Sequence, residues 1–138
     1  FFDFMECTLF KPNRKEAADA LHLPLRTDDE VRKAGAELLT RLRCDSVLIT
    51  LGSEGMMLFE RNGDVSSVPT RAKNVADVSG AGDTVIATLA AMAAAGAGLR
   101  EAAALANAAA GVVVAEPGIV AITADMLRHA VKDDEALS

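Results

Sequence analysis

The residues best suited to chemistry lie in one short stretch, Asp77–Thr84, which reads D-V-S-G-A-G-D-T. Its small residues lead directly into an Ala-rich segment that predicts a helix. Backbone N–H groups at a helix start lack intrahelical partners and lie at the positive end of the helix dipole, so they form an anion site. The carboxylate of Asp83 beside such a site suits a base that takes a proton from an attacking hydroxyl. The stretch therefore predicts phosphoryl transfer.

A purely structural explanation of the same stretch stays open at this point. Glycines are common at helix starts, and an acidic residue in the first turn complements the helix dipole. On this interpretation Asp83 stabilises a helix that begins at a glycine-rich cap.

The elements that would position this stretch follow from hydrophobic periodicity and turn residues. We expect strands at 7–10, 46–51, 56–60 and 65–68, helices at 13–21, 29–43, 80–95, 99–115 and 125–131, a turn at 52–55, an extended segment at 72–78 and a charged tail at 132–138. The order of these elements predicts an α/β fold with helices on a largely parallel sheet.

Composition narrows the class of protein. The chain has 138 residues, an apolar fraction of 51% and a net charge of −6, which predicts a globular domain and disfavours nucleic-acid and anionic-membrane partners. No apolar run is long enough to span a membrane, and no targeting segment is evident, so we expect a cytoplasmic location. Cys7 and Cys44 do not have the spacing of metal ligands. We expect Cys7 to be a buried thiol. A single disulfide between the two cysteines is the alternative.

Residues 77–84 resemble the C-terminal signature of the ribokinase-like (PfkB) carbohydrate kinases. Two further stretches agree in order: T-L-G-S-E-G at 50–55 resembles the family's nucleotide loop, and P-N-R-K-E at 12–16 resembles its N-x-x-E motif. Asn107 and the alanines after it resemble the stretch near the adenine. Within the family, the chain looks most like the heptose 7-phosphate kinases of lipopolysaccharide precursor synthesis, including the kinase half of bifunctional ADP-heptose synthases. Thr88 departs from the small residue usual in the family.

The resemblance implies roles for the residues of the 77–84 motif that lie closest to the chemistry. Asp83 would deprotonate the sugar hydroxyl. The N–H groups of Gly80, Ala81 and Gly82 would form the anion hole for the transferring γ-phosphate of ATP.

The resemblance also implies the residues around the nucleotide and its ions. Those near ATP and Mg²⁺ would be Asn13, Glu16, Thr50, Gly52, Gly55 and Asn107, with Glu16 acting on the metal through water. Asp77 and Ser79, with backbone near Val113 and Gly118, would correspond to the monovalent-cation (K⁺) site of many members.

Structural alternatives accompany these roles. Asn13 and Glu16 have the spacing of a capping box. Thr50 could simply end a strand, and Asp77 could be a turn residue. Asn107 could be a buried amide whose hydrogen bonds are satisfied within the core. His22 and His129 are expected on the surface.

The resemblance covers nearly the whole chain but only the C-terminal half of the family's domain. It implies a three-layer α/β/α fold, of which residues 1–138 would be the nucleotide-binding part, with the sugar-binding and lid part absent. Four phenylalanines within the first ten positions fit a missing N-terminal neighbour.

The activity implied is ATP-dependent phosphorylation of a sugar or sugar-phosphate hydroxyl, with heptose 7-phosphate at C1 as the closest match. Ribose, fructose and nucleoside kinases of the same fold, or a non-catalytic nucleotide-binding fragment, are the alternatives. The full-length form would be a homodimer, and the isolated chain would be poorly active.

Overall fold

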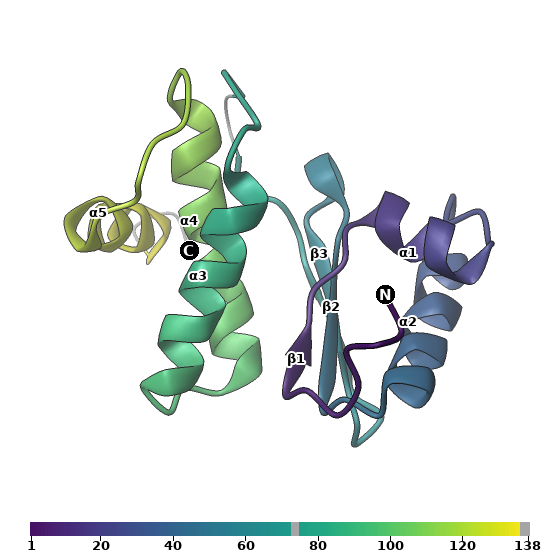
Figure 1. Cartoon of the computed structure of the whole chain (residues 1–138). Coiled ribbons are helices and arrows are strands. Elements are labelled where there is room, and N and C mark those ends of the chain that lie inside the picture. Colours follow the sequence, from purple (N-terminus) through teal and green to yellow (C-terminus); the bar gives the residue numbers. More distant parts are fainter. Residues whose placement is uncertain (73–74, 136–138) are drawn as a thin grey trace. The chain divides into compact units, whose positions relative to one another are not determined.

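The computed structural model describes the backbone of residues 1–72 and 75–135, and the side chains of residues 1–72 and 75–132. The chain divides into two compact units, Phe1–Pro69 and Thr70–Ser138 (Figure 1). Each unit carries part of the predicted site and is described by itself.

The first unit contains a four-stranded mixed sheet. Its order is β1-β2-β3-β4, from the strands β1 (Leu9–Phe10), β2 (Ser46–Thr50), β3 (Met56–Glu60) and β4 (Val65–Val68). Strands β1 and β2 are parallel, whereas β2–β3 and β3–β4 are antiparallel. The antiparallel pairs follow from short connections, because a few residues allow a hairpin but not a parallel crossover.

Two helices, α1 (Arg14–Leu21) and α2 (Asp28–Leu42), cover one face of this sheet (Figure 1). The core between them and the sheet contains an apolar stripe on α2, formed by Val31, Ala34, Leu38 and Leu42. Helix α2 approaches strand β3 so closely that a Cβ on Gly35 would lie 2.4 Å from the ring of Phe59. A glycine at this position is therefore required by packing.

Both helices begin with a capping box. Asn13 caps α1 and Thr27 caps α2, and in each helix the glutamate three residues later returns the contact, which satisfies backbone donors at the helix start.

The second unit is helical in its described residues. It contains α3 (Ala81–Ala94), α4 (Leu99–Ala115) and α5 (Ala124–Glu135), with α3 and α4 packed side by side as a hairpin (Figure 1). The buried face of α4 consists mostly of alanine, which lets neighbouring backbone approach. A Cβ on Gly111, for example, would lie 3.4 Å from the backbone of Arg71.

The α/β class expected from the sequence is confirmed. The four-stranded sheet departs from the largely parallel arrangement in being mixed, with parallel pairing only at β1–β2. The last helix continues to Glu135, so the charged residues 132–135, expected in a tail, are helical instead; residues 136–138 lie outside the described residues, as do 73–74 of the expected extended segment. The turn at 52–55 is a short 3-10 helix, η1 (Gly52–Glu54). None of the helices, over the residues described, is long and apolar enough to cross a membrane.

Candidate functional site

In the first unit, the carboxyl ends of β1 and β2 bring Asn13 and Thr50 together. The two residues form an isolated parallel bridge, and the Thr50 N–H donates to the Pro12 carbonyl at 3.0 Å. Ligand sites in α/β folds lie at the carboxyl ends of parallel strands. The two residues therefore lie at the end of the sheet where a ligand is expected.

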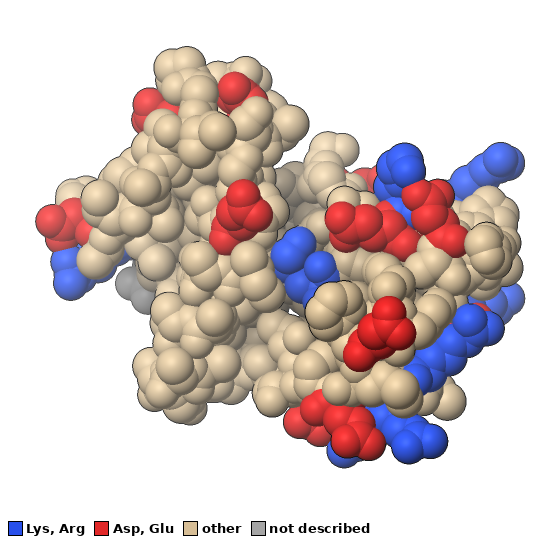
Figure 2. All heavy atoms as spheres, viewed as in Figure 1, with Lys and Arg blue, Asp and Glu red and all other residues tan. Residues whose placement is uncertain are grey.

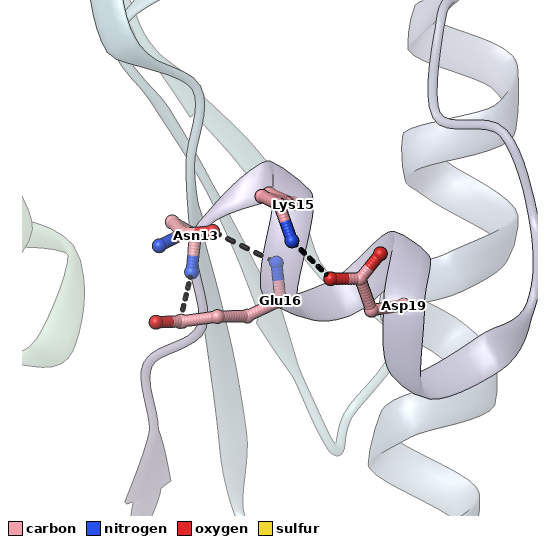
Figure 3. Close-up of polar contacts among 4 residues, drawn as sticks. All are labelled: Asn13, Lys15, Glu16 and Asp19. Atoms are coloured by element: carbon pink, nitrogen blue, oxygen red, sulfur yellow. Dashed lines mark hydrogen bonds and ion pairs between the residues drawn. The ribbon is translucent and has the colours of Figure 1, made fainter.

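Asn13 and Glu16 bind each other's backbone (Figure 3). The Glu16 N–H donates to Asn13 Oδ1 at 2.8 Å, and the Asn13 N–H donates to Glu16 Oε2 at 2.8 Å. Figure 3 shows the Glu16 side chain folded back toward the Asn13 main chain, while Lys15 pairs with Asp19 at 2.5 Å along the helix. The capping box, which was the structural alternative to ligand binding, is thus present. It holds the side chains of Asn13 and Glu16 beside the end of β2.

The turn after β2 requires glycine at both of its ends. Gly52 has φ +63° and Gly55 has φ +92°, values that side chains rarely allow. An added Cβ on Gly52 would meet no atom within 4 Å, so main chain is freely approachable there. Arg14 Nη2 pairs with Glu54 Oε2 at 2.7 Å, which joins the start of α1 to this turn. Asn13, Glu16, Thr50 and the turn therefore form one cluster.

In the second unit, Gly80 adopts the left-handed conformation (φ +79°, ψ −5°) and begins α3. The N–H groups of Gly80 and Gly82 have no acceptor among the described residues, and the Ala81 N–H donates to the Val78 carbonyl at a long 3.3 Å. Donors of this kind at a helix start form an anion site. The start of α3 thus offers amide donors, and their role as an anion hole for a phosphoryl group stays a prediction.

Asp83 is exposed in the first turn of α3, three residues after Gly80. Its carboxylate makes no ion pair or hydrogen bond with the described residues. The charged residues of 75–115 are Asp77, Asp83, Arg100 and Glu101, with one cation among them. Figure 2 shows few blue side chains over α3 and α4 on the face it presents. Anion binding in this loop would therefore rely on amides and leave Asp83 available as a base.

The segment before α3 is tied to the end of α4. The N–H groups of Ala76 and Asp77 both donate to the Val114 carbonyl, at 2.7 and 3.2 Å. Asp77 Oδ1 accepts the Ser79 N–H at 2.8 Å. This bond, with a smaller contribution from the Gly118 N–H, lowers the pKa of Asp77. Asp77 thus lies beside the chain at Val114 and Gly118, and a cation site there stays a prediction.

Asn107 lies seven residues before Val114 on α4, about 10 Å along the helix axis. It is buried, and none of the buried side-chain polar atoms in the described residues lacks a partner. The core-amide interpretation thus fits, and an adenine contact stays a prediction. Thr88, the departure from the family pattern, donates its hydroxyl to the Thr84 carbonyl at 2.8 Å, so its burial leaves no unsatisfied group.

Few side chains in the described part of the chain are placed to bind a metal ion. No group of three or more His, Cys, Asp or Glu side chains in the described part of the chain could hold a metal ion. Magnesium in phosphoryl-transfer sites needs only one or two carboxylates, because phosphates and water complete its shell. Glu16 fits such a role.

Two residues of the site were missed by sequence reasoning. Arg14 positions the η1 turn through Glu54, and its signal was its place inside the N-x-x-E motif. Ile119 lies 3.5 Å from where a Cβ on Gly80 would be, although it is far from Gly80 in the sequence, and no local pattern indicates that contact.

Comparison with known proteins decides the family. Residues 4–125 match the pfkB family of carbohydrate kinases. The chain belongs to this family. Curated relatives include the bifunctional protein HldE of Rhodospirillum rubrum, 47% identical over 98% of this chain, and that of Nitratiruptor sp., 42% identical over 94%. The chain spans 27% and 28% of the length of these two relatives.

Solved structures show the same fold. Phosphofructokinase-2 from Escherichia coli in complex with potassium superposes with a TM-score of 0.86 at 23% identity, over 96% of this chain and 42% of that one. Arabidopsis thaliana ribokinase complexed with ribose and ATP gives 0.83 at 27% identity, over 90% and 40%. The ribokinase-like fold class is confirmed, and this chain is part of such a domain.

Proposed function

We propose that the protein containing this chain transfers the γ-phosphoryl group of ATP to a sugar or sugar-phosphate hydroxyl. The observation that carries the proposal is the start of α3, where amide donors around left-handed Gly80 lie three residues from an exposed carboxylate, Asp83. Family membership supports it. Residues 1–138 would be the nucleotide-binding part of one kinase domain, with sugar-binding and lid residues outside this sequence.

The proposed mechanism assigns one task to each group. Asp83 accepts the proton of the sugar hydroxyl, whose oxygen attacks the γ-phosphorus. The N–H groups of Gly80 and Gly82 donate to the transferring phosphoryl oxygens, and Ala81 can exchange its long bond to Val78 for this charged acceptor. The donors are fixed by the helix start before reaction, so they need little reorganisation.

The nucleotide would bind along the Asn13–Thr50 strand ends and the η1 turn. Main chain at Gly52 is open to a ligand, and Asn107 would approach the adenine. Glu16 would hold Mg²⁺ through water, and the ion would neutralise phosphate charge. Asp77 and Ser79 would hold a monovalent cation such as K⁺, where the Asp77 carboxylate supplies a hard oxygen ligand.

We propose heptose 7-phosphate, phosphorylated at C1 in ADP-heptose synthesis for lipopolysaccharide, as the acceptor. This rests on the motif resemblance and on the 42–47% identity to proteins named HldE. Ribose, fructose and nucleosides are the competing acceptors. An acceptor panel assayed with the complete reading frame would separate them, and sedimentation of the same protein would test the proposed homodimer.

The decisive experiment is Asp83→Asn in the complete reading frame that contains this sequence. We expect kcat to fall by about 10²–10⁴-fold because the base is lost. The Kd for ATP should stay the same or decrease, because a negative charge beside the phosphates is removed. Steady-state kinetics and calorimetry measure the two quantities.

The matched control is Asp29→Asn, which removes an exposed carboxylate from the first turn of α2. It should leave kcat unchanged. If Asp83→Asn also retains full kcat, the catalytic assignment is wrong, and the second candidate, a non-catalytic nucleotide-binding module of the same fold, accounts for the site.

A further inference from the structure

Two cysteines outside the proposed active site lie opposite each other in the first unit. The parallel pairing of β1 and β2 matches Leu9 with Ser46 and Phe10 with Val47. Continued back by two residues, this register places Cys7 opposite Cys44. The Asp45 N–H donates to the Cys7 carbonyl at 3.1 Å, a bond that fits the same register just before the two strands begin.

The spacing suits a disulfide. Neighbouring strands lie about 4.8 Å apart, and disulfide-linked Cα atoms lie roughly 4.4–6.8 Å apart. Cys44 is 1% exposed and belongs to the core cluster, and Cys7 is partly buried against the same cluster. The Cys7 thiol makes a weak sulfur contact of 3.9 Å to the Phe4 carbonyl and already interacts with the Cys44 thiol, so the two sulfur atoms lie close together.

We propose that Cys7 and Cys44 are a redox modification site that a small disulfide such as glutathione disulfide converts into an intrachain disulfide. Partly exposed Cys7 attacks one sulfur of the oxidant, which gives a mixed disulfide and releases one glutathione thiol. Cys44 then attacks the Cys7 sulfur and expels the second glutathione thiol. Two protein thiols are oxidised to one disulfide, and the small disulfide is reduced to two thiols.

The order of the two steps follows from the environment of each thiol. Burial raises the pKa of Cys44 to about 11, and the nearby Cys7 thiol adds to the shift. Cys44 is therefore protonated at neutral pH and reacts second. The bond would join the chain before β1 to the start of β2 and enclose α1 and α2 in one loop.

The test equilibrates the purified chain in glutathione redox buffers, folded and in concentrated urea, and then traps free thiols with an alkylating agent. We expect the equilibrium constant for the intrachain disulfide to be at least about tenfold higher in the folded chain, because the fold holds the two cysteines together. Non-reduced tryptic digests should link peptide 1–14 to peptide 44–61. Cys7→Ser and Cys44→Ala should each abolish the linked peptide.

Three outcomes would overturn the proposal. The first is an equilibrium constant for the intrachain disulfide that is equal or smaller in the folded chain than in urea. The second is a disulfide that joins two chains through Cys7. The third is a folded chain whose oxidation stops at the mixed disulfide with glutathione. The wild-type comparison decides the matter even if a cysteine variant fails to fold. The proposal does not depend on kinase activity, so its failure would leave the proposed function untouched.

Discussion

Asn13 in the first unit both caps helix α1 and lies where the nucleotide is proposed to bind. Asn13 accepts the Glu16 N–H and at the same time lies beside Thr50 at the strand ends. Loss of the cap and loss of a ligand contact would thus be confounded in an alanine variant. Aspartate separates them, because its carboxylate still accepts the backbone N–H.

For Asn13→Ala we expect a loss of about 1 kcal/mol in unfolding free energy, from the lost cap. Asn13→Asp should keep that stability but raise the KM for ATP in the complete reading frame, because it places a negative charge near the phosphates. Urea unfolding and steady-state kinetics measure the effects. The control Thr27→Ala loses the equivalent cap of α2 and should leave the KM unchanged; a matching rise in KM there would show that stability alone was responsible.

The two thiols should differ in reactivity. Because the pKa of Cys44 is raised to about 11, its reactive thiolate is scarce below pH 9 in the folded chain. We expect slow alkylation of Cys44 at pH 8, faster reaction as the pH approaches 11, and rapid reaction in urea. Mass spectrometry of alkylated peptides follows each site. Equal rates for Cys44 in the folded and unfolded chain would contradict the burial of this thiol.

At the scale of elements, the close approach of α2 to β3 depends on one position. Gly35→Ala would place a methyl group 2.4 Å from the Phe59 ring, and the buried ring has little room to shift. We expect a net destabilisation of about 1–3 kcal/mol despite the better helix propensity of alanine. Urea unfolding measures it. Thr40→Ala, on the exposed side of the same helix, should change stability by less than about 0.5 kcal/mol.

Most elements could be predicted because their signals are local. The hydrophobic periodicity of the helices and strands and the capping-box spacing of Asn13 and Glu16 all act within a few residues of themselves. The glycine loop of α3 was likewise found from its own residues. Position along the sequence could not reveal that Gly35 touches Phe59 or that Ile119 reaches Gly80, because these contacts depend on packing between distant segments.

At the scale of the whole molecule, the chain is a fraction of its relatives. It covers 42% of the phosphofructokinase-2 chain and about a quarter of the HldE proteins. The residues that bind the acceptor and exclude water would lie outside this sequence, and positioning contributes a large part of catalysis.

We therefore expect the isolated 138-residue chain to bind ATP weakly and to phosphorylate heptose 7-phosphate several orders of magnitude more slowly than the complete reading frame. Coupled assays of ADP release and calorimetry on both proteins provide the comparison. Comparable turnover by the isolated chain would contradict the assignment of residues 1–138 to the nucleotide-binding part alone.

The carbonyl of Val114 receives the N–H groups of both Ala76 and Asp77, and this has an evolutionary consequence. The anchor is a main-chain oxygen, so it does not depend on which side chain occupies position 114, provided that the helix itself persists. Substitutions on the exposed side of α4 can accumulate while this attachment is inherited unchanged, whereas the buried face must keep its small residues. Lineages of this protein can thus diverge on the exposed side of that helix and still conserve the geometry at Gly80.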